Sequence, residues 1–257
     1  MSYTLRFCSW NIQVGMKRAQ LMEIVRAYAD FQKLDLVALQ ETSALGTRPD
    51  AASIAEILGA TFTSYQNVYH HHGARPQGNG LVWNTRRIQM HAVEQHLLPR
   101  VQQTKISRLE RAALRPLNRQ NRMNVVAEGA FDGLSLRVCS AHLDVLGLRF
   151  KRQQFHAVLE ELRRRPAVEL MILAGDFNTF RIGGRPNWNG LKREAAELGL
   201  RAISDEIAWT QAVRSLRFRQ KLDEIFVASS HPFRSRVWTL DVNGSDHLPV
   251  FAEIVIA

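Results

Sequence analysis

Apolar runs with strand character alternate along the chain with amphipathic stretches, and this pattern predicts a mixed α/β protein. Strands are predicted at Thr4–Trp10, Asp35–Gln40, Thr61–Tyr69, Leu81–Trp83, Arg87–Val93, Met123–Phe131, Leu134–Ala141, Leu170–Ala174, Lys221–Ala228, Arg236–Leu240 and Leu248–Ile256. Helical spacing of apolar residues predicts helices at Lys17–Phe31, Asp50–Leu58 and Arg149–Arg165, part of Thr104–Leu114, and a helix ending near Leu198. A loop is expected at His70–Gly80, which holds three glycines and three consecutive histidines.

Several predicted strands end in a polar residue, and these residues are Asn11, Glu41, His142, Asp176 with Asn178, and Asp246 with His247. Taken singly, each has an ordinary structural explanation as a turn, cap or satisfied core residue. Helices separate several of the strands, so we expect two layers of mixed sheet with helices outside and the polar strand ends gathered at one site. Five such ends in one chain favour a functional site over five unrelated turns.

The side chains at these strand ends suit a hard cation. Carboxylate and amide oxygens are the ligands that Mg²⁺ or Mn²⁺ prefers, usually together with water and phosphate oxygens. The histidines would then transfer protons or bind phosphate. No HxxxH or CxxC spacing favours zinc.

The most informative feature of the composition is the net charge. The 257 residues carry a formal net charge of +10, which favours a polyanionic partner such as nucleic acid, an anionic membrane surface or a phosphorylated small molecule. The segment from Arg100 to Arg122 holds seven basic residues against one acid. The size fits one domain over residues 1–257. The two cysteines, Cys8 and Cys139, lie in apolar runs and are expected to be buried thiols.

Neither a secretory signal nor an apolar run of membrane-spanning length is visible in the sequence. We therefore expect a cytoplasmic protein without integral membrane contact, and a monomer.

The motifs WNIQ (10–13), LQET (39–42), GNGLVWN (78–84), SAHLD (140–144), GDFN (175–178), KLDEIF (221–226) and GSDHLPV (244–250) occur in this order. Together they resemble the endonuclease/exonuclease/phosphatase superfamily, which includes deoxyribonuclease I. The resemblance implies a four-layer α/β sandwich, with two packed mixed β-sheets flanked by helices, and metal-dependent hydrolysis of phosphoester bonds.

The resemblance also implies roles for single residues. Glu41 would be the main Mg²⁺ (or Mn²⁺) ligand, with Asn11 beside it and Asp246 supporting the metal or His247. Asp176 and Asn178 would orient the nucleophilic water and the phosphate. His247, held by Asp223, would be a general base or a phosphate donor, and His142 would face the phosphate from the other half of the site. Whether Asp176 or His247 takes the proton from water stays open at this point.

Substrate contacts are expected from Arg122, from Asn84 at the end of GNGLVWN, and from Arg108, Arg111 and Arg115 in the basic segment. Three departures from family patterns matter. Gln13 stands where the abasic-site endonucleases have a second metal carboxylate, and HLD replaces their tyrosine motif. Gln77 and Asn79 fall where other members carry an acid that partners the first histidine.

The substrate is the least determined part of the interpretation. A nuclease acting on nucleic acid is favoured by the basic charge. The alternatives are a phosphatase or phosphodiesterase acting on phospholipid headgroups or small phosphoesters, and a non-catalytic binding module on the same fold. The binding module fits poorly, because the residues that would catalyse hydrolysis are all present.

Overall fold

Two mixed β-sheets form the centre of the molecule. The computed structural model describes residues 2–73, 75–114, 121–179, 181–182, 185–186, 188–213 and 218–257. The first sheet has the order β18-β19-β1-β2-β7-β5, with β6 paired to β7, and the second has the order β14-β17-β11-β10-β9-β8. The first sheet is built from β1 (Tyr3–Asn11), β2 (Leu36–Thr42), β5 (Phe62–Gln66), β6 (His70–His72), β7 (Arg75–Asn84), β18 (Phe233–Thr239) and β19 (Val250–Ile256). The second is built from β8 (Ile88–Leu97), β9 (Met123–Phe131), β10 (Leu134–His142), β11 (Leu170–Asp176), β14 (Arg201–Ala202) and β17 (Asp223–Ser229).

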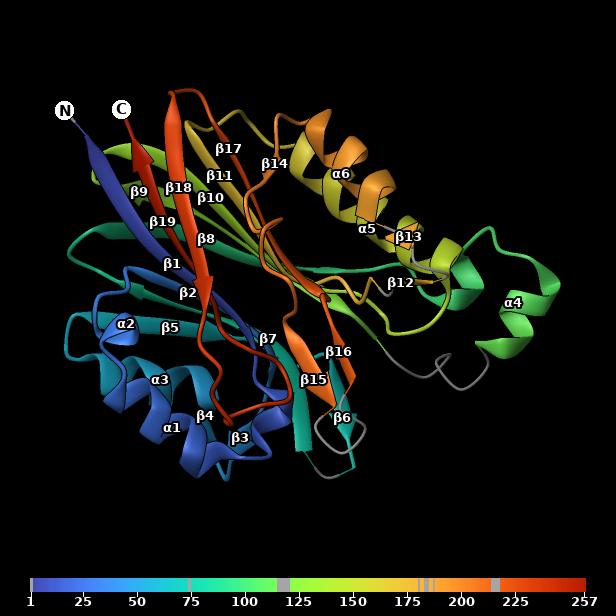
Figure 1. The fold of residues 1–257 in the computed structure, drawn as a ribbon, viewed down its shortest axis with the longest axis horizontal. Coiled ribbons are helices and arrows are strands. Elements are labelled where there is room, and N and C mark those ends of the chain that lie inside the picture. Colours follow the sequence, from blue (N-terminus) through green and yellow to red (C-terminus); the bar gives the residue numbers. More distant parts are fainter. Residues whose placement is uncertain are drawn as a thin grey trace.

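Helices cover the outer face of each sheet (Figure 1). The helices α1 (Arg18–Ala27), α2 (Ala29–Gln32) and α3 (Asp50–Leu58) pack on the first sheet, and α5 (Leu148–Arg163) and α6 (Trp188–Ala196) pack on the second. The short elements are η1 (Gln13–Gly15), η2 (Val101–Gln103), α4 (Arg108–Ala113) and the two-stranded pairs β3 (Ala44–Leu45) with β4 (Arg48–Pro49), β12 (Arg181–Ile182) with β13 (Arg185–Pro186), and β15 (Gln211–Val213) with β16 (Phe218–Gln220). This arrangement confirms the expected four-layer sandwich.

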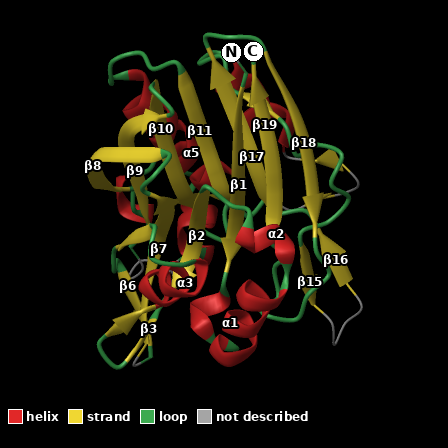
Figure 2. Ribbon diagram, turned by 90° about the vertical axis from the view of Figure 1, so that its left-hand side faces the viewer, coloured by secondary structure: helices red, strands yellow, loops and turns green. Residues whose placement is uncertain are grey.

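Each central strand is apolar on both faces because both faces are covered. On β1, Leu5 and Phe7 enter the core between the sheets, whereas Cys8 and Trp10 pack beneath α1 and α2. Continuous apolar runs are what such doubly buried strands require. Both cysteines are buried and free, as expected. The termini lie side by side (Figures 1 and 2), since Tyr3 of β1 pairs with Ile256 of β19.

The topology brings the polar strand ends to one edge. In the first sheet β1 and β2 are parallel, so their carboxyl ends lie at the same edge. In the second sheet the same is true of β10 and β11. Across β10 and β11, His142 lies opposite Asp176, which in turn lies opposite Asp223 of antiparallel β17. Between the sheets, the Gln40 amide donates to Ser140 Oγ (3.1 Å), and Ser140 Oγ donates to the carbonyl of Leu39 (3.1 Å). These buried polar contacts fix the two sheets relative to each other just below the strand ends.

Two element predictions were wrong. The expected single helix at 17–31 is interrupted at Tyr28, whose extended backbone separates α1 from α2. The expected loop at His70–Gly80 is largely strand, because β7 begins at Arg75 and pairs with β2 and β6. Gly78 permits this pairing, since a Cβ there would lie 1.7 Å from the carbonyl oxygen of Asn67. Strand formation here depends on distant partners and not on local propensity.

Among the described residues, no helix combines the length and the apolar character that crossing a membrane requires.

Candidate active site

The polar strand ends line one cleft of about 600 Å³. Of the residues discussed from the sequence, the cleft is lined by Asn11, Gln13, Glu41, His70, Gln77, Arg122, His142, Asp176, Asn178, Asp246 and His247. Asp223 lies directly behind this lining and contacts His247. The structure therefore brings together residues that are up to 236 positions apart in the chain, since the cleft spans Asn11 to His247.

His247 and Asp223 form a buried dyad. The Nδ1 atom of His247 lies 2.8 Å from Oδ2 of Asp223. The backbone around His247 is held as well, because its N–H donates to Ser245 Oγ and its carbonyl accepts from the indole of Trp10. Burial opposes a positive charge on His247, but the carboxylates of Asp223 and Asp176 outweigh burial and raise the pKa of His247 to about 10. His247 therefore carries its proton at neutral pH.

Asp176 lies at the centre of the cleft. Its Oδ1 accepts the backbone N–H of Asn178 (2.9 Å) and its Oδ2 accepts the side-chain amide of Asn11 (2.9 Å). The same Oδ2 lies 3.6 Å from Nε2 of His142 and 3.6 Å from Nε2 of His247. Burial raises the pKa of Asp176, in spite of the nearby His247 cation. Asp176 is thus the carboxylate that both imidazoles face.

His142 is held from behind by groups that are not carboxylates. Its Nδ1 lies 3.1 Å from the hydroxyl of Tyr69 and 3.1 Å from a guanidinium nitrogen of Arg122. Since a guanidinium can only donate, Nδ1 accepts and the proton of the neutral ring lies on Nε2. Burial, followed by the charges of Arg122 and His247, holds the pKa of His142 well below its usual range. His142 is therefore a neutral ring that presents an Nε2–H group to the cleft.

Arg122 is itself fixed by a buried chain of hydrogen bonds. Its Nε donates to Oδ1 of Asp144 (3.2 Å), and Oδ2 of Asp144 accepts from the side-chain amide of Gln154 on α5 (2.8 Å). Gln154 also accepts the backbone N–H of Asp144 (3.0 Å). The Nδ1 atom of His142 thus faces a cation and a phenol and not a carboxylate, so no negative charge polarises this ring from behind.

The side chain of Glu41 reaches the cleft because the pairing of β2 with β7 is irregular at this residue. The pairing of β2 with β7 shifts register between Gln40 and Thr42, and Glu41 has a left-handed φ of 51°. Such a bulge re-aims the side chain away from the strand face, at a backbone cost of about 1–3 kcal/mol that the surrounding sheet must offset. Glu41 Oε1 lies 3.7 Å from Nε2 of His142. Burial raises the pKa of Glu41, and Arg122 and His247 oppose this shift.

The cleft offers oxygen ligands to a cation from two sides. Atoms of Asp176, Asp223 and His247 lie within 4.8 Å of one another, so this buried group could hold a metal ion. Glu41 and Asp246 line the same cleft. Within the described part of the chain, two buried polar atoms here lack a hydrogen-bond partner: Nε2 of His142 and Oδ1 of Asp223. Unpaired buried polar atoms next to hard oxygen donors fit a site for a cation and a phosphate.

The loops after β10 and β11 are joined by Lys151 of α5. Its ammonium donates to the carbonyls of Val145 (2.9 Å) and Asn178. The side-chain amide of Asn178 donates to the carbonyl of Leu143 (2.9 Å). Asn178, like Glu41, has a left-handed φ of 51°. These contacts hold the end of the GDFN segment at the wall of the cleft.

Three of the expected substrate contacts lie away from the cleft. Asn84 lies at the far end of β7, where its Oδ1 accepts the N–H of Arg86 and its own N–H donates to Asp35. Arg111 donates to the carbonyls of Val101, Gln102 and Thr104, so its guanidinium stabilises the turn before α4. Arg108 is exposed on α4, which lies at the outer edge of the molecule (Figure 1). Arg115 lies outside the described residues.

Four residues of the site were not predicted from the sequence: Tyr69, Asp144, Gln154 and Lys151. Gln154 and Lys151 carried a usable signal, because they interrupt the apolar face of α5 and are buried there. A polar residue on a buried helix face requires a hydrogen-bond partner, and here the partners are the loops of the site. Tyr69 carried no local signal.

Comparison with known proteins identifies the family. The model of the Endonuclease/Exonuclease/phosphatase family matches residues 8–247. No curated protein sequence is significantly similar to the chain.

Several solved structures share the fold. A family protein from Bacteroides vulgatus has a TM-score of 0.74 at 13% identity, with 99% of this chain and 100% of that chain covered. TDP2 of D. rerio, complexed with a single-strand DNA product, has a TM-score of 0.66 at 17% identity, with 98% of each chain covered. The mannosyl-6-phosphatase Bt3783 of Bacteroides thetaiotaomicron has a TM-score of 0.68 at 14% identity, with 97% of this chain and 99% of that chain covered.

At these identities the solved structures establish the fold, whereas the family model establishes descent over nearly the whole chain. With a buried Asp–Asp–His cluster that could hold a metal, the chain belongs to the endonuclease/exonuclease/phosphatase family and is a metal-dependent phosphoesterase.

Proposed function

We propose that this phosphoesterase is a nuclease that hydrolyses phosphodiester bonds of nucleic acid with Mg²⁺ or Mn²⁺. The main observation behind the proposal is that the neutral imidazole of His142 and the charged imidazole of His247 both face Asp176. Each Nε2 atom lies 3.6 Å from Oδ2 of Asp176. Such a site can activate water and stabilise the charge of a phosphoryl group from two directions. The net charge of +10 supports a polyanionic substrate, as does the fold shared with a TDP2 that holds a DNA product.

We assign the cation to the Glu41 side of the cleft, where Asn11 and Asp246 supply further oxygens. The Asp223 Oδ2 atom is already occupied by the hydrogen bond to Nδ1 of His247, so that pair is better suited to holding a proton than an ion. When bound, the cation would neutralise charge on the phosphate and lower the barrier to attack by water.

The remaining steps, proton transfer and stabilisation of charge on the phosphoryl group, fall to side chains of the protein. Asp176, whose pKa burial raises, accepts the proton of the attacking water. His247 stays protonated because the Asp223 carboxylate stabilises its positive charge, and its Nε2–H donates to the phosphoryl group. His142 donates from Nε2 without carrying a charge, and Arg122 holds it in that tautomer. Asn11 keeps the Asp176 carboxylate in position through its amide.

The second candidate is a phosphatase or phosphodiesterase acting on small phosphoesters or phospholipid headgroups. It is favoured by the shared fold of the mannosyl-6-phosphatase and by the position of α4, whose basic residues lie away from the cleft. We also propose that the protein acts as a monomer in the cytoplasm, which gel filtration and cell fractionation would test.

One experiment separates these substrates. The purified protein is assayed with Mg²⁺, Mn²⁺ or excess EDTA, in parallel on single-stranded DNA, duplex DNA, RNA, sphingomyelin, inositol phosphates and a hexose 6-phosphate. The nuclease proposal expects metal-dependent cleavage of a nucleic acid at a kcat/KM at least tenfold above that on every small phosphoester. A hexose phosphate or a lipid as the best substrate would overturn the proposal and establish the second candidate.

A further inference from the structure

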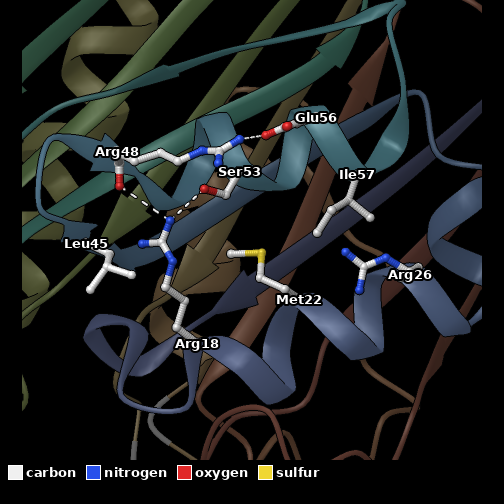
Figure 3. A pocket seen from close by; sticks show the side chains of 8 residues that line it. All are labelled: Arg18, Met22, Arg26, Leu45, Arg48, Ser53, Glu56 and Ile57. Atoms are coloured by element: carbon white, nitrogen blue, oxygen red, sulfur yellow. Dashed lines mark hydrogen bonds and ion pairs between the residues drawn. The ribbon is translucent and has the colours of Figure 1, made fainter.

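Two further hollows lie next to the active-site cleft, on the outer face of the first sheet. Val14 and Met16 line the cleft and also a second hollow of about 500 Å³. Arg18, Met22 and Leu45 line this second hollow and also a third of about 560 Å³ between α1 and α3 (Figure 3). Because each hollow shares lining residues with the next, the three lie side by side in a row. We call the second and third hollows together the basic groove.

Arginines supply most of the charge of the basic groove. Arg18, Arg26, Arg48 and Arg75 line it against two acids, Asp50 and Glu56. Arg18 is a structural residue, since its guanidinium donates to the buried Asp50. It also donates to Ser53 and to the carbonyl of Arg48 (Figure 3). It therefore neutralises Asp50 and shapes the floor of the groove.

The other three arginines are accessible to a ligand. Arg48 pairs with Glu56, but their side chains are 57% and 64% exposed. A guanidinium nitrogen of Arg26 lies 3.8 Å from a carboxylate oxygen of Glu23, and their side chains are 63% and 79% exposed. Figure 3 shows the Arg26 side chain extending toward Met22 and Ile57. Arg75 is exposed at the start of β7. Exposed ion pairs are worth only about 0–1 kcal/mol, so a phosphate can displace the carboxylate partners.

Apolar side chains lie between these arginines. Met16 and Leu45 are 62% and 71% exposed, which is high for apolar residues beside a polar active site. Met22 and Ile57 add apolar surface between the helices (Figure 3). A lining that alternates between cations and apolar groups fits a single strand, whose phosphates and unstacked bases are both accessible. In a duplex the bases are stacked inside and would leave the apolar surface uncovered.

We propose that the basic groove binds the part of a single-stranded nucleic acid that extends beyond the scissile phosphodiester. The strand would pass from the cleft over Met16 toward Arg75, and then between α1 and α3 toward Arg26 and Arg48. This inference rests on the proposed nuclease function and adds the substrate form and the side on which the strand leaves the site. It also moves the expected phosphate contacts from α4 to the outer face of the first sheet, at α1 and α3.

The test compares two variants of the full chain, each of which replaces three arginines by glutamine and so removes the same amount of positive charge. The groove variant is Arg26→Gln, Arg48→Gln and Arg75→Gln. The control variant is Arg86→Gln, Arg164→Gln and Arg234→Gln, whose arginines are exposed on the turn after β7, at the end of α5 and on β18. Binding is measured for single-stranded DNA, RNA and duplex DNA of increasing length at 50 to 200 mM salt. Hydrolysis of bis(p-nitrophenyl) phosphate is measured beside it.

Three phosphate contacts on a single strand contribute about 2 to the slope of log affinity against log salt, or about a 20-fold loss of affinity between 50 and 200 mM. We expect the groove variant to lose that part of the slope, to bind long single strands at least tenfold more weakly at low salt, and to gain nothing from added length. The control variant should keep the length dependence, and both should cleave the small diester at the parental rate. The DNA and RNA arms identify the kind of strand.

Two results would overturn the inference while leaving the nuclease proposal intact: equal salt slopes in the groove variant and the control variant, or a parent that binds duplex more tightly than single strands. A parent that neither binds nor cleaves any nucleic acid would instead overturn the nuclease function itself.

Discussion

Replacing Asp223 by asparagine tests the central dyad. The substitution keeps the shape of the side chain but removes the charge that faces Nδ1 of His247 at 2.8 Å. An asparagine amide can also present its N–H₂ to Nδ1, which would favour the wrong tautomer of the ring. Both effects weaken the charged Nε2–H donor that His247 presents to the phosphoryl group.

The geometry sets the expected magnitude. Asp223 and His247 are 1% and 3% exposed, so solvent does not screen their interaction. A hydrogen bond to a charged group contributes about 1.5–3 kcal/mol, which corresponds to a decrease in kcat of about 10- to 150-fold. Replacing His247 by alanine removes the donor altogether and should cost about 10²–10⁴-fold. The double variant should lose little beyond His247→Ala, because the two residues act as a unit.

The assay is kcat with Mg²⁺ on a small diester, with thermal unfolding measured on each variant. Asp35→Asn is a matched control, because Asp35 is also a buried carboxylate, 4% exposed, and accepts from the backbone of Arg6 and from Arg87 at the far end of β2. It should lower the unfolding temperature and leave kcat unchanged. If Asp223→Asn and His247→Ala reduced kcat by factors that simply multiply in the double variant, the pairing would be refuted.

Three further predictions concern the metal and the pH profile. Glu41→Gln should remove most hydrolysis and weaken Mg²⁺ dependence, measured by Mg²⁺ titration, because an amide is a poorer ligand than a carboxylate; full activity in EDTA would contradict it. The rate should rise with pH through about 7 as Asp176 loses its proton and fall through about 10 as His247 loses its own, so a rate that is flat from pH 5 to 8 would exclude Asp176 as the base. Changing His70–His72 to alanine should leave the Mg²⁺ requirement unchanged, because successive residues of a strand alternate between its two faces and three in a row cannot all ligate one ion; a shifted requirement would show that this run takes part in metal binding.

Local chemistry was enough to predict the layers and most of the site. Apolar runs that end at Asn11, Glu41, His142 and Asp176 predicted doubly buried strands with their polar ends at one edge, and the structure has this arrangement. The rule behind the prediction is physical, since carboxyl ends of parallel strands share an edge. The hairpin of β9 and β10 also follows from local chemistry, because Asp132 and Gly133 supply the left-handed turn that joins the two strands.

Contacts between distant segments could not be predicted in this way. The strand β7 forms at Arg75–Gly80 only because β2 and β6 supply its backbone hydrogen bonds, and Tyr69 becomes a partner of His142 only once β5, β7 and β10 are assembled. The basic segment shows the same dependence. Its arginines look alike in sequence, yet Arg122 is buried against Asp144 while Arg111 caps the carbonyls of a turn.

The layers, the cleft residues at the strand ends and the family could all be predicted from the sequence, because they depend on strand periodicity and on motifs a few residues long. The tertiary structure was needed to show which arginines are exposed beside the cleft and which make internal contacts, and how His142 is held in its tautomer. These properties are set by packing between segments far apart in the chain, and neither residue spacing nor propensity encodes which surfaces will meet.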